Sequence, residues 1–322
     1  MLVLGLQGSP RKKGNTEFLL NEFMKESEKK GAQTHIIDAC GGNINHCIGC
    51  GSCEKKGFCI FDDEMSREVY PLLRRADVIL LATPVYFYNT TSHLKTLIDR
   101  GQALWSRRYK YLLEDPYNNH RKGVVLSIGA TKGENLFDGV NLTAKYFFDA
   151  VGAIFDGGLT YRRIEERGAI ASYPGILNDI KNEVERIVTP YLKRKKILFA
   201  CRENACRSQM ASAFAQYVAG DKIEAFSGGS TPAENINPVM IEAMNEKGLD
   251  MAYKKPQSID SGVSQVTPDI IVTMGCSEEC PFIPGVEKID WQLPDPAGES
   301  LEFMRNVRDE IERKVFDLAD GL

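Results

Sequence analysis

Apolar residues along the first half of the chain follow two alternating patterns. Short runs in which apolar and β-branched residues predominate, as in strands, lie at 2–6, 34–37, 78–82, 124–128 and 153–155. Amphipathic stretches with helical spacing follow them at 17–29, 66–74, 92–100, 136–150 and 176–192. Alternation of strands with helices predicts a parallel sheet with helices on both faces, the doubly wound α/β class. In that class, ligands bind at the carboxyl ends of the strands.

The second half repeats this alternation with fewer elements. Strand-like runs lie at 197–200 and 269–273, and helical patterns lie at 209–214 and 301–318. We therefore predict two doubly wound parallel-sheet domains, residues 1–193 and residues 194–322. They meet at the basic run 191–196, which we interpret as a solvated helix end and not as a contact for nucleic acid.

Composition excludes some classes of function. The chain has 322 residues and a formal net charge of −4, which argues against a general nucleic-acid binder. Its apolar runs are all shorter than the roughly 20 residues of a membrane span. The start, Met1 to Gly5, has no charged leader region and predicts a first strand instead of a signal peptide. Nine cysteines in tight motifs indicate metal and redox use in a reducing cytoplasm.

Residues 201–208, CRENACRS, place a cysteine at a strand end and an Arg-Ser pair at a helix start. Backbone N–H groups of such a loop converge on a tetrahedral oxyanion, and Arg207 adds a planar fork. The same positive field favours the nucleophilic thiolate form of Cys201. A buried structural cysteine is the alternative, and the spacing of Cys and Arg-Ser disfavours it.

This octet resembles the C-x5-R-S loop of the low-molecular-weight tyrosine phosphatase superfamily, which includes thiol-dependent arsenate reductases. The resemblance implies that Asn204 holds the loop and that Ser208 and Arg207 complete the catalytic site. Downstream, Leu293-Pro294-Asp295-Pro296 matches the segment in which the superfamily places its general acid. Asp295 would therefore protonate the leaving oxygen.

Cys276 and Cys280 favour a reductase over a phosphatase. Reduction of arsenate requires two electrons, so thiols beyond Cys201 are needed, and residues 273–281, TMGCSEECP, resemble the redox-cysteine loop of the reductases. Ala297 stands where phosphatases of the superfamily often carry an aromatic residue. The resemblance implies that Cys201 attacks arsenate, that Cys276 then attacks Cys201 and releases arsenite, and that Cys280 resolves the disulfide. The alternative is that both cysteines are incidental residues of a loop and have no redox role.

Two loops of the first half together indicate a flavin site. Residues 8–16, GSPRKKGNT, bring Gly and hydroxyl residues before a helix, as a phosphate cradle requires, and residues 83–89, TPVYFYN, follow the third strand. Each alone is as readily a plain loop, but together they resemble the flavodoxin-like FMN reductases over roughly residues 1–190. The resemblance implies FMN contacts from Ser9, Pro10, Arg11, Gly14, Asn15, Thr16, Pro84, Val85, Tyr86, Phe87, Asn89, Gly129 and Ala130.

Four cysteines lie between the second and third predicted strands. Cys47, Cys50, Cys53 and Cys59 follow the pattern C-x2-C-x2-C-x5-C. Three thiolates two residues apart, with a fourth nearby, suit one [4Fe–4S] cubane, whereas zinc sites usually use two separated pairs. The motif resembles that of the iron–sulfur flavoproteins, a branch of the FMN reductases, and this implies a cluster at these four residues.

These patterns lead us to expect a fused flavoprotein–arsenate reductase. FMN and the cluster would return electrons to the cysteine pair, with NAD(P)H or ferredoxin as the donor; a thioredoxin-like reductant is the other source. We expect a cytoplasmic homo-oligomer that binds arsenate or a phosphate-like oxyanion and neither nucleic acid nor a membrane. Three alternatives remain: a tyrosine phosphatase with a flavin redox domain, an FMN or quinone reductase with a redox-sensing second domain, and a non-catalytic arsenical sensor.

Overall fold

The computed structural model describes residues 1–261, 267–275 and 285–322, and the chain divides into two compact units. The N-terminal unit comprises Met1–Leu112 and Tyr117–Leu192. The C-terminal unit comprises Leu113–Pro116 and Lys193–Leu322, so a short segment from the first half of the sequence belongs to the second unit. Within the described ranges, no helix combines the length and the apolar character that crossing a membrane requires.

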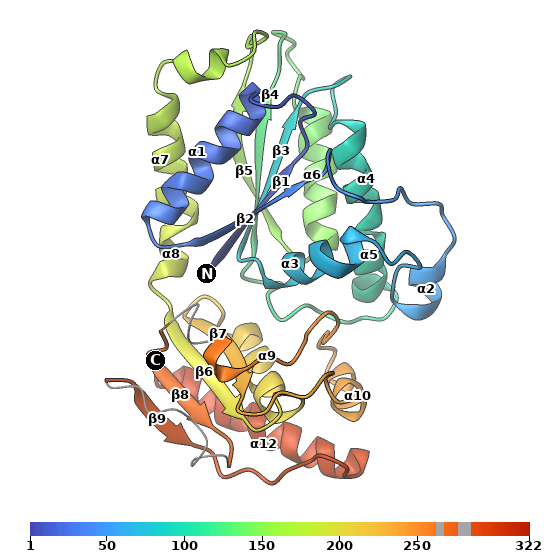
Figure 1. Cartoon of the computed structure of the whole chain (residues 1–322), viewed down its shortest axis with the longest axis vertical. Helices are drawn as coiled ribbons and strands as arrows, with labels where there is room; N and C mark the ends of the chain where they lie inside the picture. Colours follow the sequence, from blue (N-terminus) through green and yellow to red (C-terminus); the bar gives the residue numbers. More distant parts are fainter. Residues whose placement is uncertain (262–266, 276–284) are drawn as a thin grey trace. The chain divides into compact units, whose positions relative to one another are not determined.

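The N-terminal unit contains a five-stranded parallel sheet with strand order β2-β1-β3-β4-β5 (Figure 1). This is the strand order of the flavodoxin-like doubly wound fold. The three central strands are almost wholly buried because helices cover both of their faces. The bounds are β1 Leu2–Gln7, β2 Gln33–Asp38, β3 Val78–Pro84, β4 Lys122–Ile128 and β5 Ile154–Tyr161.

The strands confirm the expected sheet, with β5 longer than predicted. Gly157 and Gly158 interrupt the apolar run of this strand, and glycine inside a strand usually marks an irregularity. Gly158 has φ +146°, and a Cβ there would lie 1.9 Å from the carbonyl oxygen of Val125. The pairing of β4 with β5 shifts register at this point. Strand β5 then continues to Tyr161, beyond the end that the sequence pattern predicted.

Helices α1 and α7 cover one face of this sheet, and α3, α4 and α6 cover the other (Figure 1). Leu19 and Phe23 of α1 pack with Ile180 and Val184 of α7 in the core above the strands. The helix expected at 176–192 is wrong as one element, because Pro190 lacks an N–H and ends α7 before a short α8. The bounds are α1 Asn15–Lys29, α2 Ser52–Lys56, α3 Tyr70–Arg75 (after a π-helical turn Met65–Val69), α4 Ser92–Arg100, α5 Gln102–Tyr109, α6 Asp138–Ala150, α7 Ile176–Ile187 and α8 Thr189–Leu192, with a 3-10 turn at Ala169–Ser172.

The C-terminal unit contains a four-stranded parallel sheet in the order β7-β6-β8-β9, which confirms the second α/β domain. Phe214 of α9, Met244 of α10 and Ile311 of α12 meet in one core against the sheet. The bounds are β6 Lys195–Cys201, α9 Arg207–Ala219, β7 Ile223–Gly229, α10 Pro238–Glu246, β8 Ile270–Thr273, β9 Glu287–Asp290 and α12 Leu301–Asp320.

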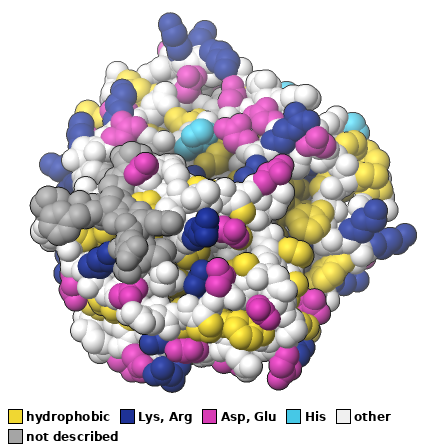
Figure 2. Space-filling model, turned by 60° about the horizontal axis from the view of Figure 1, so that its bottom comes forward, with side chains coloured by type: hydrophobic (Ala, Val, Ile, Leu, Met, Phe, Trp, Pro, Cys, Tyr) yellow, Lys and Arg dark blue, Asp and Glu magenta, His cyan; other side chains and the backbone are white. Residues whose placement is uncertain are grey.

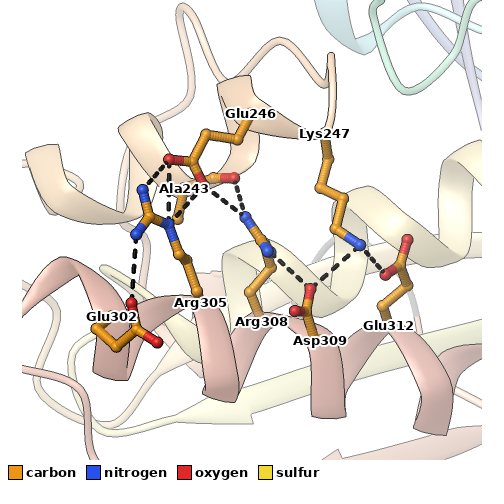
Figure 3. Close-up of polar contacts among 8 residues, drawn as sticks. All are labelled: Ala243, Glu246, Lys247, Glu302, Arg305, Arg308, Asp309 and Glu312. Carbon is orange, nitrogen blue, oxygen red and sulfur yellow. Dashed lines mark hydrogen bonds and ion pairs between the residues drawn. The ribbon is translucent and has the colours of Figure 1, made fainter.

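Helix α12 is fixed to the end of α10 by a chain of ion pairs (Figure 3). Glu246 receives bonds from both Arg305 and Arg308, and Lys247 bridges to Asp309 and Glu312. The hydrogen bond from Arg305 holds the pKa of the Glu246 carboxyl down at about 2. The face of the molecule in Figure 2 carries interspersed basic and acidic side chains, as expected for a net charge of only −4.

Candidate functional site

The loop between β6 and α9, residues 201–208, surrounds the sulfur of Cys201 with polar groups. We call it the oxyanion loop. Cys201 ends β6 and is buried, and its Sγ lies 3.0 Å from Ser208 Oγ. The backbone N–H of Asn204 donates to the same sulfur at 3.2 Å. Helix α9 begins at Arg207, so its amino-terminal dipole lies at this loop.

Asn204 makes hydrogen bonds on several sides of the oxyanion loop. Its backbone is left-handed, with φ +51°, and its Nδ2 donates to Ser208 Oγ at 2.7 Å. Its Oδ1 accepts from Gln209 Nε2 at 3.1 Å and from the backbone N–H of Gln257 at 2.9 Å. A Cβ at Gly229 would lie 2.6 Å from the carbonyl oxygen of Arg202, so only glycine fits beside this turn. Sequence reasoning missed Gln209 and Gln257.

Arg207 joins three segments that are far apart in the sequence. Its Nη1 donates to the carbonyl oxygens of Met274 at 3.0 Å and Leu293 at 3.1 Å. Its Nη2 forms an ion pair with Asp295 at 3.1 Å. The guanidinium is mostly buried, whereas 58% of the Asp295 side chain is exposed. The predicted acid therefore lies beside the predicted oxyanion-binding arginine.

The C-terminal unit has three further cysteines, Cys206, Cys276 and Cys280. Cys276 and Cys280 lie outside the described residues, but Met274, a partner of Arg207, precedes Cys276 by two positions. Cys206 is buried next to the site, and burial raises the pKa of its thiol to about 12. Cys206 therefore stays protonated near neutral pH and is a poor nucleophile.

The predicted phosphate loop connects β1 to α1 and is tied to the neighbouring strand. Gly8 donates its N–H to Ala82 at 2.8 Å, and its carbonyl accepts from Thr91 Oγ1 at 2.6 Å. Gly14 precedes α1 without a side-chain cap, which leaves the first N–H groups of the helix without an intrahelical partner. Ser9 and Thr16 are buried at this loop, whereas Pro10 and Arg11 are exposed.

The side chain of Asn15 connects the phosphate loop to another segment of the chain. Its Nδ2 donates to the carbonyl of Glu166 at 2.8 Å, and its Oδ1 accepts from the N–H of Ile170 at 3.2 Å. Both ends of the amide therefore hold the segment 166–170 against the phosphate loop. This segment was not singled out from the sequence.

The loop after β3 forms a strained, exposed turn. Tyr86 and Asn89 exchange two backbone hydrogen bonds of 2.9 Å, and Phe87 and Tyr88 between them have φ of +48° and +61°. Left-handed backbone in bulky residues costs roughly 1–3 kcal/mol each and is concentrated at functional sites. Phe87 is fully exposed. The turn therefore presents aromatic side chains at the carboxyl edge of the sheet.

The predicted phosphate loop, the loop after β3 and the segment with Gly129 and Ala130 lie at one edge of the sheet, because they follow the adjacent strands β1, β3 and β4. The N–H of Val85 donates to Ile128 at 3.0 Å, which ties the second loop to the third; Pro84 and Val85 are half-buried. Gly129 leaves no room for a side chain, since a Cβ would lie 2.5 Å from Leu136, and Ala130 next to it is exposed. The arrangement can hold a ligand with a phosphate at one end and a flat ring at the other.

The cysteine loop, residues 47–59, lines a cavity of about 450 Å³. All four predicted cluster cysteines, Cys47, Cys50, Cys53 and Cys59, lie on its wall together with Arg100. All four are free thiols. Throughout the described ranges, no group of three or more His, Cys, Asp or Glu side chains converges closely enough to hold a single metal ion. The cysteines thus surround a space without meeting at one point.

Both ends of the cysteine loop are fixed to one buried ion pair. Arg100 forms a two-bond fork with Asp63, at 2.7 and 3.0 Å, and donates to the carbonyl of Asn45 at 2.7 Å. Asn45 donates its backbone N–H to Asp63 at 3.0 Å. Burial would raise the pKa of Asp63, but the bonds from Arg100 and Asn45 outweigh it and hold the pKa at about 2. Arg100, Asn45 and Asp63 therefore hold the two ends of the cysteine loop together.

Comparison with known proteins matches a different family to each half. Residues 1–155 match the family described as NADPH-dependent FMN reductase, and residues 196–322 match low molecular weight phosphotyrosine protein phosphatase. Arsenate reductase 2 of Staphylococcus haemolyticus is 38% identical over 128 residues, which are 38% of this chain and 95% of that protein. Arsenate reductase 1 of Staphylococcus epidermidis is 37% identical over 132 residues, 40% of this chain and 98% of that protein.

An iron–sulfur flavoprotein of Archaeoglobus fulgidus is 41% identical over 100 residues, which are 31% of this chain and 45% of that protein. The chain thus spans less than half of this relative but nearly the whole of the two arsenate reductases. Both resemblances inferred from the motifs are confirmed. The chain belongs to the low molecular weight phosphotyrosine protein phosphatase family through a C-terminal domain of the arsenate reductase type, which is fused to an N-terminal domain of the FMN reductase and iron–sulfur flavoprotein type.

Proposed function

We propose that the protein reduces arsenate to arsenite and that its own flavoprotein domain regenerates the thiols. The observation that carries this proposal is the set of contacts of Arg207. One guanidinium joins the Cys201 loop, the segment leading to Cys276 and the segment that carries Asp295. Arg207, the proposed oxyanion-binding side chain, therefore connects the loop of the proposed nucleophile, the segment of the proposed acid and the segment that leads to the proposed redox cysteines.

In the proposed reaction, the Cys201 thiolate attacks arsenic, and an arsenate oxygen leaves as water with a proton from Asp295. Cys276 then attacks the sulfur of Cys201. The arsenic–sulfur electron pair stays on arsenic, which departs as arsenite, and a Cys201–Cys276 disulfide forms. Cys280 attacks Cys276, which frees Cys201 and leaves a Cys276–Cys280 disulfide. Two electrons and two protons must then return to that disulfide.

Substrate binding would change the partners of Arg207. The guanidinium pairs with Asp295 in this structure, and a bound oxyanion would compete for the same Nη2. Asp295 would then be released toward the leaving oxygen. Ser208 and the N–H of Asn204 would keep their contacts with the Cys201 sulfur until attack.

The N-terminal domain has residues that fit FMN and a [4Fe–4S] cluster. The uncapped start of α1 with Ser9 and Thr16 suits the phosphate of FMN, and the turn at Tyr86–Asn89 suits its ring. A cubane keeps its four ligands apart around itself, whereas zinc needs them at one point, so the cavity favours the cluster. FMN would supply two-electron chemistry and the cluster one-electron transfer, with NAD(P)H or ferredoxin as the donor.

The test is turnover under anaerobic conditions with arsenate and one electron donor at a time. We expect many turnovers without an added carrier. If the protein stops after one turnover until thioredoxin is added, the internal electron route is wrong and the reductase assignment stands. Hydrolysis of an aryl phosphate with no reduction of arsenate would instead identify the tyrosine phosphatase.

A further inference from the structure

A buried arginine side chain with one unpaired N–H group lines the cavity of the cysteine loop. The side chain of Arg100, at the end of α4, is only 1% exposed, and the residue lines the cavity with the four cysteines. Its Nη1 donates to the carbonyl of Asn45 and to Asp63, and its Nη2 donates to Asp63. Its Nε is buried as well, yet it has no hydrogen-bond partner among the described residues.

This unpaired donor cannot be satisfied by a small rotation. The guanidinium is planar and its fork to Asp63 fixes the plane, so moving Nε would break the two bonds of 2.7 and 3.0 Å. The Cζ atom of the same guanidinium lies over the ring of Phe61, 5.1 Å from the ring centroid. A buried polar group without a partner costs about 1–3 kcal/mol, and native proteins rarely leave one in that state.

The guanidinium of Arg100 shares the wall of the cavity with the four cysteines. A rigid cationic donor on the wall of a cavity lined by thiols suits an anionic sulfur acceptor inside it.

We propose that Arg100 donates its Nε–H to a sulfur of the cluster held by the cysteine loop and thereby raises the reduction potential of the cluster. This inference rests on the cluster assignment in the proposed function. Reduction adds negative charge to the cluster, and hydrogen bonds to its sulfurs favour the more negative form. Arg100 is thus a positioning residue for the loop and also a residue that adjusts its redox chemistry.

A purely structural role for Arg100 makes different predictions. Arg100→Lys keeps the positive charge but removes Nε–H and the planar fork. Asp63→Asn weakens the clamp and leaves Nε–H in place. Arg107→Lys is the matched control, because Arg107 donates to the carbonyl of Gly57 at 3.3 Å in the same loop and is not among the described residues that line the cavity.

Full-length proteins prepared without oxygen are assayed for iron, acid-labile sulfide and FMN, and the cluster is titrated with EPR detection. We expect Arg100→Lys to lower the reduction potential. Arg107→Lys should lower the cluster content and leave the potential of the loaded fraction unchanged. Asp63→Asn should also lower the content, but it keeps Nε–H and removes a negative charge beside Arg100, so it should not lower the potential. An unchanged potential in Arg100→Lys would overturn the inference alone. Wild-type protein without iron and sulfide would overturn the cluster assignment as well.

A measurement on the wild type covers the case in which Arg100→Lys does not fold. Arg100 is the one arginine among the described residues that line the cavity. Protein grown with ¹⁵N-arginine should show a ¹⁵N hyperfine coupling to the reduced cluster in pulsed EPR. A reduced cluster without that coupling would rule out the Nε–H···S bond, whatever the variants do.

Discussion

The two cysteine-bearing loops of this protein are built on opposite principles. In the oxyanion loop, the sulfur of Cys201 is buried and already has two polar neighbours, the N–H of Asn204 and the hydroxyl of Ser208. In the cysteine loop, four thiols line a cavity, and protein bonds hold the two ends of the loop and the carbonyl of Gly57 within it. The first loop surrounds one sulfur with polar groups, whereas the second leaves its sulfurs around a space.

The comparison teaches where each loop is vulnerable. The oxyanion loop has bonds at the Cys201 sulfur itself, so we expect changes there to affect the proposed chemistry before they affect folding. The cysteine loop has the Arg100–Asp63 pair at its base, so we expect changes there to affect stability and the loading of the proposed cluster. Breaking a buried pair by removing one partner is strongly destabilising.

Replacing Cys201 should have the largest effect on activity. Cys201→Ser is expected to abolish arsenate reduction, because a hydroxyl near neutral pH is a far weaker nucleophile than a thiolate. Reduction of bound flavin by the electron donor should continue. The matched control is Cys206→Ala, which removes a thiol whose pKa of about 12 keeps it protonated, and we expect it to retain most activity. Equal loss in both variants would contradict the assignment of Cys201 as nucleophile.

Replacing a thiol of the other loop should separate the two functions. Cys50→Ser is expected to remove the cluster, measured as loss of iron and acid-labile sulfide, while the first turnover of arsenate reduction is kept. Single-turnover rates under quenched conditions would show this. A variant that loses its first turnover together with its iron would show that the two loops are not independent.

Replacing Arg207 should slow the reaction by about 100-fold, comparable to the loss of one oxyanion donor. Arg207→Lys keeps the charge but cannot contact Met274, Leu293 and Asp295 together. The measurement is kcat/KM for arsenate. A change in KM alone would mean that Arg207 binds the substrate without stabilising the transition state.

Acid should weaken the base of the cysteine loop. The pKa of Asp63 is lowered from 3.8 to about 2 in the folded protein, so its stabilisation is complete above about pH 4 and is lost as the pH falls toward 2. Linkage gives about 2 kcal/mol for this shift. Thermal unfolding should therefore show Asp63→Asn destabilised at pH 6 and similar to wild type near pH 2. A difference that does not change with pH would exclude this origin.

Sequence patterns were sufficient for the sheets and for the candidate residues that lie together in one loop. Cys201, Asn204, Arg207 and Ser208 could be found because strand, loop and helix start fix their spacing. Gln257 and the Arg100–Asp63 pair could not, because they come from separate elements that only folding brings together. The single helix predicted at 176–192 failed because apolar periodicity continues through Pro190, whereas this residue has no N–H to continue the hydrogen bonds of α7 and lies in the separate α8.

The segment Leu113–Pro116 has a consequence for the architecture of the gene. Glu114 donates its N–H to Gly248 at 2.7 Å and accepts from the N–H of Asp250 at 2.8 Å, and its carboxylate accepts from Tyr217 at 3.1 Å. These bonds belong to the C-terminal unit, although the codon for Glu114 lies within the first coding half. A gene cut after codon 192 would therefore encode a second product without a piece of its own fold, so two open reading frames divided at that point would not be equivalent to the fusion.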